Sequence, residues 1–229
     1  MVNPIDAPGT DEKDWRAWAG FDALPVLDPA RWRSVAVVAA HPDDEVLGIG
    51  GLMAMLADRG VRLRLIAVTD GEASHPAADL AERRIAESAA ALKHIGDVEI
   101  VRLGLPDSGV RDEDLLRLLP ELVEGFDACL APWDKDVHRD HEAVGRVAAA
   151  CGVEVWHFPI WTWHWARPAD PRLPWDRAVR VPLLPSVAER KRVAIDCFTS
   201  QIEGADPILP PGVIAHFTRG WEVLFDSRA

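Results

Sequence analysis

The segment His-Pro-Asp-Asp-Glu at residues 41–45 contains four side chains that can bind a metal ion or transfer a proton. It follows residues 34–38, a short apolar run rich in β-branched residues, which is typical of a strand buried on both faces. Apolar residues recur at nearly helical spacing over residues 46–57, so the segment is predicted to form the turn between a strand and a helix. In an open α/β sheet, ligands bind at such a turn, beyond the carboxyl end of a strand.

His41 and Asp44 are three residues apart, a spacing that places both side chains on one face of a helix. Imidazole and carboxylate ligands suit Zn²⁺, and Fe²⁺, Mn²⁺ or Co²⁺ can take its place. Asp43 is predicted to point elsewhere and to reach a water molecule on the metal without being a ligand. One alternative remains open, because Asp43, Asp44 and Glu45 can also cap the helix and complement its dipole.

A second cluster, at residues 133–142, supplies candidates for the third ligand. It follows the apolar run at residues 128–131 and precedes an apparent helix, so two turns that carry His and Asp are expected to face each other at one edge of the sheet. His138 and His141 repeat the three-residue spacing, and Asp140 is placed to orient one of them. His141 alone could equally be a surface histidine at a helix N-terminus. The two clusters together predict a metal site.

The Ala-His-Pro-Asp-Asp-Glu turn and the downstream His-x-Asp-His resemble the motifs of the LmbE/PIG-L family of zinc-dependent N-acetyl-sugar deacetylases. The resemblance runs from about Val35 to Gly152 and continues more loosely to the end of the chain. Members of this family remove acetyl groups from N-acetylglucosamine units of lipid anchors, low-molecular-weight thiols and glycosylated antibiotics. Close relatives cleave amide bonds in thiol S-conjugates.

The resemblance implies a role for each residue of the two motifs. The zinc ligands that it implies are His41, Asp44 and His141. It implies that Asp43 is the general base and that His138 stabilises the developing oxyanion or acts as an acid. Asp140 would be the partner of His138, fixing its tautomer and favouring its charged form. The chain departs from the family pattern in having Arg139 where Pro is usual and in having no Tyr.

These residue types suit amide hydrolysis. A zinc ion with three protein ligands keeps an open position for water, lowers the pKa of that water to about 7 and polarises a carbonyl. The family resemblance further implies that the hydrolase removes an N-acetyl, or similar short N-acyl, group from an amino sugar carried on a small molecule. Two alternatives remain, an amidase of thiol S-conjugates and a non-catalytic glycan-binding protein with structural zinc. The intact Asp43 argues against the second, because a binding protein needs no base there.

Strands and helices are expected to alternate along the chain with short links. Further strands are expected at residues 63–68, 98–103, 126–131, 153–158 and 177–181 and within 216–225, and helices at 79–95, 112–124, 142–150 and 186–199. This order predicts one α/β domain over residues 1–229, with a Rossmann-like, mostly parallel sheet and helices on both faces. Gly48 and Gly50 follow the acidic turn rather than lying in it, and Met53 occupies the position of the motif's third glycine, so a dinucleotide site is not predicted.

Residues 157–176 are rich in Trp and Pro and are predicted to form a loop over the site. The aromatic faces can stack on sugar rings, but a hydrophobic lid or a subunit contact explains them equally well. The candidates for substrate contact are Arg84, Asp107, Trp163, His164 and Arg167. Arg84 can instead form a surface pair with Glu87, and Asp107 can simply form a turn.

The composition limits the partners and the setting. The net charge of −12 argues against nucleic acid and against an anionic membrane surface as partners. The family resemblance implies a small amino-sugar substrate. No apolar run approaches the roughly 20 residues of a membrane span. The three cysteines have no Cys-x-x-Cys spacing and suggest a cytoplasmic protein. Residues 1–14 are expected to be a loose acidic arm without a secretory signal. The oligomeric state stays open, homo-oligomers included.

Overall fold

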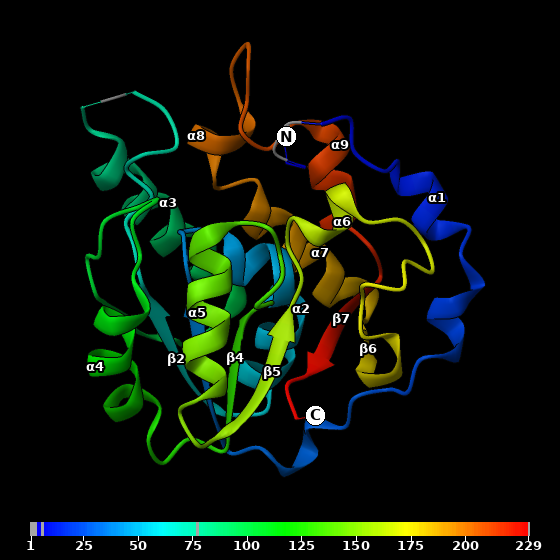
Figure 1. The fold of residues 1–229 in the computed structure, drawn as a ribbon, viewed down its shortest axis with the longest axis horizontal. Coiled ribbons are helices and arrows are strands. Elements are labelled where there is room, and N and C mark those ends of the chain that lie inside the picture. Colours follow the sequence, from blue (N-terminus) through cyan, green and yellow to red (C-terminus); the bar gives the residue numbers. More distant parts are fainter. Residues whose placement is uncertain (1–3, 6, 77, 229) are drawn as a thin grey trace.

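A seven-stranded sheet runs through the computed structural model, which describes residues 4–5, 7–76 and 78–228 (Figure 1). The strand order within the described residues is β3-β2-β1-β4-β5-β7-β6. The strands are β1 (Ser34–Ala39), β2 (Arg62–Ala67), β3 (Glu99–Arg102), β4 (Ala128–Pro132), β5 (Glu154–Phe158), β6 (Ala178–Pro182) and β7 (Trp221–Asp226). Strands β1 to β5 pair in parallel, and β7 runs antiparallel to both β5 and β6.

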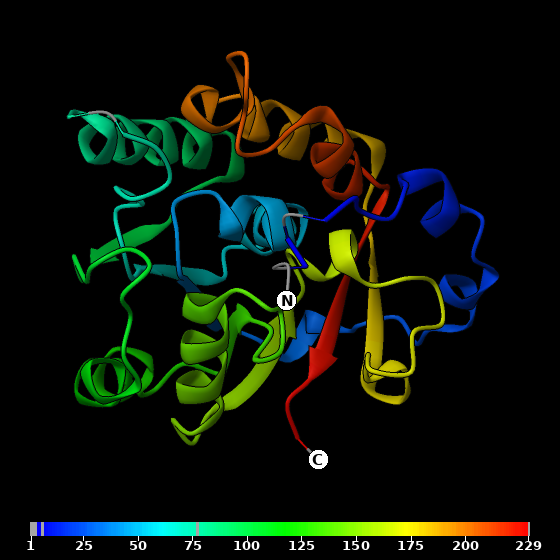
Figure 2. The same ribbon diagram turned by 45° about the horizontal axis from the view of Figure 1, so that its top comes forward.

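Helices cover both faces of this sheet, as predicted (Figure 2). One layer contains α2 (Asp44–Asp58), α3 (Leu80–Ile95) and α7 (Pro185–Ile195), and the other contains α4 (Asp112–Val123) and α5 (Arg139–Ala149). Every residue of β1 is buried, with Val35 and Val37 packed in the first layer and Ala36 and Val38 in the second. This two-sided burial is why residues 35–39 are all apolar rather than alternating with polar residues.

The strand order reverses at β1, which lies between β2 and β4. Chains that leave neighbouring parallel strands in opposite directions open a crevice at the carboxyl edge of the sheet. The turn at residues 40–43 follows β1, and residues 133–138 follow β4, the strand hydrogen-bonded to β1. The two predicted clusters are therefore brought to one point by the topology of the sheet.

Helix α2, which begins at the first cluster, is interrupted at Ile49, where φ is −140° and ψ is 19°. The break removes the usual helical partners of the following amides. The Glu222 carboxylate of β7 replaces them, accepting hydrogen bonds from the Gly51 amide (2.7 Å) and the Leu52 amide (2.8 Å). Lys191 Nζ neutralises this buried carboxylate at 2.7 Å. The last strand thus supports the helix that carries Asp44.

The arm predicted at residues 1–14 includes the start of a helix. Residues 1–3 and 6 lie outside the described residues, but α1 (Glu12–Arg16) begins within the predicted arm. The Glu12 carboxylate accepts hydrogen bonds from Arg219 Nη2 at 2.6 Å and pairs with His216 Nδ1 at 2.8 Å. The Arg219 guanidinium also lies over the Trp163 ring, 4.4 Å from its centroid. No helix in the described part of the chain has the length and apolar character of a membrane span.

The Glu12 contacts predict a pH-dependent contribution to stability. Burial opposes the charged form, but hydrogen bonds to His216 and Arg219 outweigh it and lower the pKa of Glu12 from 4.5 to about 2. Stability from a depressed carboxyl pKa is complete above pH 4.5 and is lost as the pH falls toward 2. Glu12→Gln should therefore lower the free energy of unfolding by about 1 to 2 kcal/mol at pH 7, since partial exposure screens the pairs.

The prediction is checked by measuring the free energy of unfolding in urea for the wild type and Glu12→Gln between pH 7 and pH 3. The difference between them should shrink below pH 4.5, where the Glu12 carboxyl of the wild type begins to lose its advantage. Glu203→Gln, at an exposed glutamate, is the control and should change little at any pH. A difference that stayed constant down to pH 3 would rule out the charge of Glu12 as its source.

Candidate metal and catalytic site

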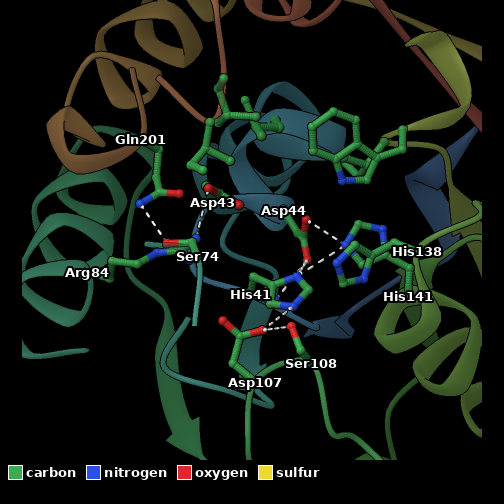
Figure 3. A pocket seen from close by; sticks show the side chains of 15 residues that line it. His41, Asp43, Asp44, Ser74, Arg84, Asp107, Ser108, His138, His141 and Gln201 are labelled. Atoms are coloured by element: carbon green, nitrogen blue, oxygen red, sulfur yellow. Dashed lines mark hydrogen bonds and ion pairs between the residues drawn. The ribbon is translucent and has the colours of Figure 1, made fainter. Parts of the chain in front are cut away.

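His41, Asp44 and His141 converge at the carboxyl edge of β1 and β4, and all three are buried (Figure 3). His41 Nδ1 lies 3.2 Å from His141 Nε2. One Asp44 oxygen lies 3.5 Å from His41 Nδ1 and the other 3.3 Å from His141 Nε2. Ligand atoms on a tetrahedral zinc ion, at bond lengths of about 2.0–2.1 Å, are separated by about 3.3 Å. The three side chains thus fit one ion of this size.

The outward nitrogens of both histidines meet carboxylates. His41 Nε2 lies 3.2 Å from an oxygen of Asp140 and 3.2 Å from an oxygen of Asp107. His141 Nδ1 lies 2.7 Å from an oxygen of Asp136. Metal-binding histidines commonly hold their second N–H in this way, which fixes the tautomer and leaves the other nitrogen free to bind the metal. The surroundings of both histidines therefore fit a metal site as well as their positions do.

The neighbouring carboxylates favour the charged forms of both histidines. Burial disfavours the protonated form of His141, but Asp44 and Asp136 outweigh it and raise its pKa to about 9. Burial likewise opposes the charge on His41, yet hydrogen bonds to Asp107, Asp140 and Asp44 raise its pKa well above 6.5. Metal binding to these nitrogens requires their protons to leave, so it should release protons.

Asp43 lies in the chain between His41 and Asp44, and its backbone is strained, with φ 128° and ψ −32°. Such a backbone costs about 1–3 kcal/mol and is typically found at functional sites. Arg84 Nη2 holds the turn, donating to Asp43 Oδ2 at 3.0 Å and to the Pro42 carbonyl at 2.7 Å. Burial, assisted by the nearby Asp44 charge and opposed by Arg84, raises the pKa of Asp43 to about 7. A carboxylate with this pKa can accept a proton near neutral pH.

His138 and Asp140 differ from their sequence-based description. His138 is the N-cap of α5, and its Nδ1 accepts the Asp140 backbone N–H at 3.3 Å. The Asp140 carboxylate instead accepts the amides of Ser108 (2.7 Å) and Val110 (3.2 Å), which direct it toward His41 rather than His138. Burial and the neighbouring histidines lower the pKa of His138 to about 3, so Asp140 does not keep it charged.

Other ligand sets are available within the same cluster. Ring nitrogens of His41, His138 and His141 lie within 4.8 Å of one another, and so do ligand atoms of His41, Asp107 and Asp140. The second set uses His41 Nε2, which points away from His141 Nε2 and Asp44. His138 therefore lies close enough to be either a ligand or a catalytic group beside the metal.

The cluster forms part of the lining of an open cleft of about 160 Å³. The cleft is lined by His41, Asp43, Asp44, Leu47, Ser74, Arg84, Asp107, Ser108, His138, His141, Ile160, Trp161, Gln201, Ile208 and Leu209. Arg84 and Asp107, two of the predicted substrate contacts, are among these residues. Sequence reasoning missed Ser74, Ser108 and Gln201, which no motif marks, and it missed Asp136, the partner of His141 Nδ1.

The other three predicted contacts lie away from this cleft. Trp163 is buried, with its ring centroid 5.0 Å from that of Trp15, because the short helix α6 (Thr162–Trp165) turns it into the core. His164 Nε2 lies 2.9 Å from the Ala7 carbonyl oxygen, and Arg167 is exposed. Of the predicted loop at residues 157–176, only Ile160 and Trp161 line the cleft.

The sheet and the His and Asp cluster at its topological switch point define an α/β protein with a candidate metal site. Comparison with known proteins identifies its family. Residues 36–151, about half of the chain, match the PIG-L family model, described as GlcNAc-PI de-N-acetylase. The chain therefore belongs to the PIG-L family, as its two motifs indicated. The predicted fold is confirmed by the same comparisons.

Three proteins are similar to this chain, one in sequence and two in solved structure. The chain is 39% identical over 93 residues to 1D-myo-inositol 2-acetamido-2-deoxy-alpha-D-glucopyranoside deacetylase 2 of Saccharopolyspora erythraea, a match that covers 34% of each chain. The N,N'-diacetylchitobiose deacetylase of Pyrococcus horikoshii has a TM-score of 0.64 and 20% identity, covering 76% of this chain and 73% of that one. The 4-carboxy-2-hydroxymuconate hydratase of Pseudomonas putida has a TM-score of 0.62 and 20% identity, covering 81% and 83%.

These matches support different conclusions about the chain. Matches to the inositol-type deacetylases span only 26% to 34% of the length of those relatives. The two solved structures show a shared fold, and one is a deacetylase whereas the other is a hydratase. Because one fold serves both reactions, the activity of this chain must be argued from its own site.

Proposed function

We propose that this protein is a metal-dependent hydrolase that removes an N-acetyl, or similar short N-acyl, group from an amino sugar carried on a small molecule. The observation that carries the proposal is the position of the Asp43 carboxylate in one cleft with His41, Asp44 and His141. Family membership supports it, and so does the name of the Saccharopolyspora relative, which specifies a 2-acetamido sugar.

The proposed ligands are His41, Asp44 and His141, whose donor set accepts Zn²⁺ and also Fe²⁺, Mn²⁺ or Co²⁺. When bound, such an ion lowers the pKa of water and polarises a carbonyl. Asp43 accepts the proton of the attacking water, and Arg84 holds the carboxylate in position. With a pKa of about 7, the Asp43 carboxylate is substantially ionised at neutral pH and can also return the proton to the leaving amine.

His138 is proposed as the donor to the developing oxyanion. The Asp140 amide can only donate, so His138 Nδ1 must be the acceptor of their hydrogen bond. The proton of the neutral imidazole therefore resides on Nε2, the nitrogen left to face a substrate. A neutral N–H donor in a partly buried cleft stabilises negative charge without losing its own proton.

The outer cleft supports an amino-sugar substrate. Ser74, Ser108 and Gln201 provide hydrogen-bonding groups, and Trp161 and Leu209 provide apolar surface. A sugar ring needs both, because its edge carries hydroxyl groups and its face is apolar. The setting is proposed to be cytoplasmic, which is supported by free thiols at all three cysteines.

Acetate release from a panel of N-acetylglucosamine derivatives tests the proposal, with a thiol S-conjugate amide included for comparison. The metal content of the protein is measured first, and a chelator-treated sample is the control. Acetate release that depends on the metal would support the deacetylase. Cleavage of the thiol conjugate alone would favour the amidase, and no turnover at full metal occupancy would contradict hydrolase activity and favour a glycan-binding protein.

Replacing His138 with alanine should lower kcat by about 10² to 10³-fold while the metal content stays at the wild-type level. The reason is loss of the proposed oxyanion donor rather than loss of a ligand. His138→Asn is the matched variant, because an asparagine amide donates a hydrogen bond and also caps a helix well. It should retain more activity than His138→Ala. Metal loss in His138→Ala would instead make His138 a ligand, and an unchanged kcat would remove it from catalysis.

A further inference from the structure

The Asp136 carboxylate is fully buried and joins two separate parts of the site. Its Oδ2 lies 2.7 Å from His141 Nδ1 and accepts the Trp161 amide at 2.9 Å. Its Oδ1 accepts the amides of Ile160 (3.1 Å) and Thr162 (2.8 Å) and also the Thr162 hydroxyl. One side chain thus receives hydrogen bonds from a proposed metal ligand and from three consecutive residues, two of which line the cleft.

The contact with His141 determines which ring nitrogen is free. A carboxylate only accepts hydrogen bonds, so Nδ1 of His141 carries the proton between the two groups. Nε2 is then directed at Asp44 and His41, where a metal would bind. An outer carboxylate of this kind orients the ring and increases its basicity as a ligand.

The other contacts of Asp136 shape the cleft. Three successive backbone N–H groups, at residues 160–162, point at its two oxygens. Two of these residues, Ile160 and Trp161, line the cleft, and the third begins the short helix α6. Without the carboxylate, these amides would be left unpaired in a buried place, which is costly.

We propose that Asp136 is a positioning residue that fixes both His141 and the Ile160–Thr162 wall, so that metal binding and ordering of the substrate-binding wall are coupled. The inference rests on the proposed metal site, but it does not require that the substrate be an amino sugar. A carboxylate that served only to cap α6 would support the wall and leave metal affinity unchanged.

Asp136→Asn separates these roles when it is paired with Thr162→Val. The asparagine amide cannot accept five donors, so metal affinity should fall by about 10- to 100-fold, the usual effect of losing an outer partner. At saturating metal its KM should remain several-fold above wild type, with a smaller change in kcat. Thr162→Val removes only the hydroxyl contact on the wall side, so KM should rise while metal affinity stays close to wild type.

Metal affinity is measured by competition with a chelator and therefore needs no turnover. Wild-type metal affinity in Asp136→Asn would refute the link to His141. A normal KM at saturating metal would refute the link to the wall. Absence of activity in every protein would count against the proposed reaction and leave the metal measurement interpretable.

Hydrogen exchange in the wild-type protein gives a second test, which holds even if Asp136→Asn does not fold. The amides of residues 160–162 should exchange several-fold more slowly with metal than after chelation. The Arg33 and Ser34 amides, which donate to the Asp127 carboxylate at the other end of β1, are the matched controls. A larger change at residues 160–162 than at the controls supports the coupling. An equal change at both places, or none, would overturn it.

Discussion

Replacing Asp43 with asparagine is expected to lower kcat for acetate release by about 10²- to 10⁴-fold, the range for losing a general base. Metal content should be unchanged, because Asp43 lies beside the proposed ligands without being one of them. Asparagine occupies the same volume and tolerates positive φ better than most residues, so the strained turn can persist. Steady-state kinetics on protein with quantified metal measures the effect.

Glu45→Gln is the matched control from the same turn. Burial, together with the Asp43 and Asp44 charges, raises the pKa of Glu45 to about 8, so its carboxyl is largely protonated at neutral pH. An amide imitates that neutral group, and kcat should stay close to wild type. An Asp43→Asn enzyme that retained most of its kcat would mean that another group accepts the proton.

Removing His141 is expected to abolish both metal binding and turnover. In His141→Ala the ion would lose a ligand, and the buried Asp44 and Asp136 carboxylates would lose a partner at 3.3 Å and 2.7 Å. The fall in metal affinity should exceed the roughly 10- to 100-fold typical of losing an outer partner. Competition with a chelator and acetate release measure the two effects on the same protein.

A second buried histidine provides the control. His157 lies on β5 with Nδ1 3.0 Å from the Pro132 carbonyl oxygen, away from the cleft. His157→Gln should keep both metal and activity, while folding of each variant is checked by circular dichroism. Stoichiometric metal in folded His141→Ala would show that His141 is not a ligand.

The sequence predicted the meeting of the two motifs because one simple rule governs it. His41 and His141 follow strands that pair in parallel, so their turns share one edge of the sheet. The alternation of strands and helices along the chain was sufficient to predict that helices cover both faces of the sheet. The alternation did not predict that β7 runs antiparallel to β5 and β6. No local sequence pattern marks the direction of a strand.

Residues positioned by irregular backbone were harder to predict. Asp136 reaches His141 across a turn in which Val137 has φ 72°, a conformation that the sequence does not announce. The short helix α6 decides that Trp161 lines the cleft while Trp163 enters the core, and a run of closely spaced tryptophans cannot show this phase. Gln201 comes from a distant short helix, α8 (Thr199–Ile202), with no motif around it.

The interruption of α2 bears on how the protein folds. All proposed ligands lie within the family-matched residues 36–151, yet the Gly51 amide meets Glu222, which is 171 positions further along the chain. Contacts of such sequence separation have a high entropic cost of loop closure and slow folding. A nascent chain that ends before β7 would contain every proposed ligand but lack the contacts that support the helix carrying Asp44. Metal capture should therefore be a late event in the maturation of this protein.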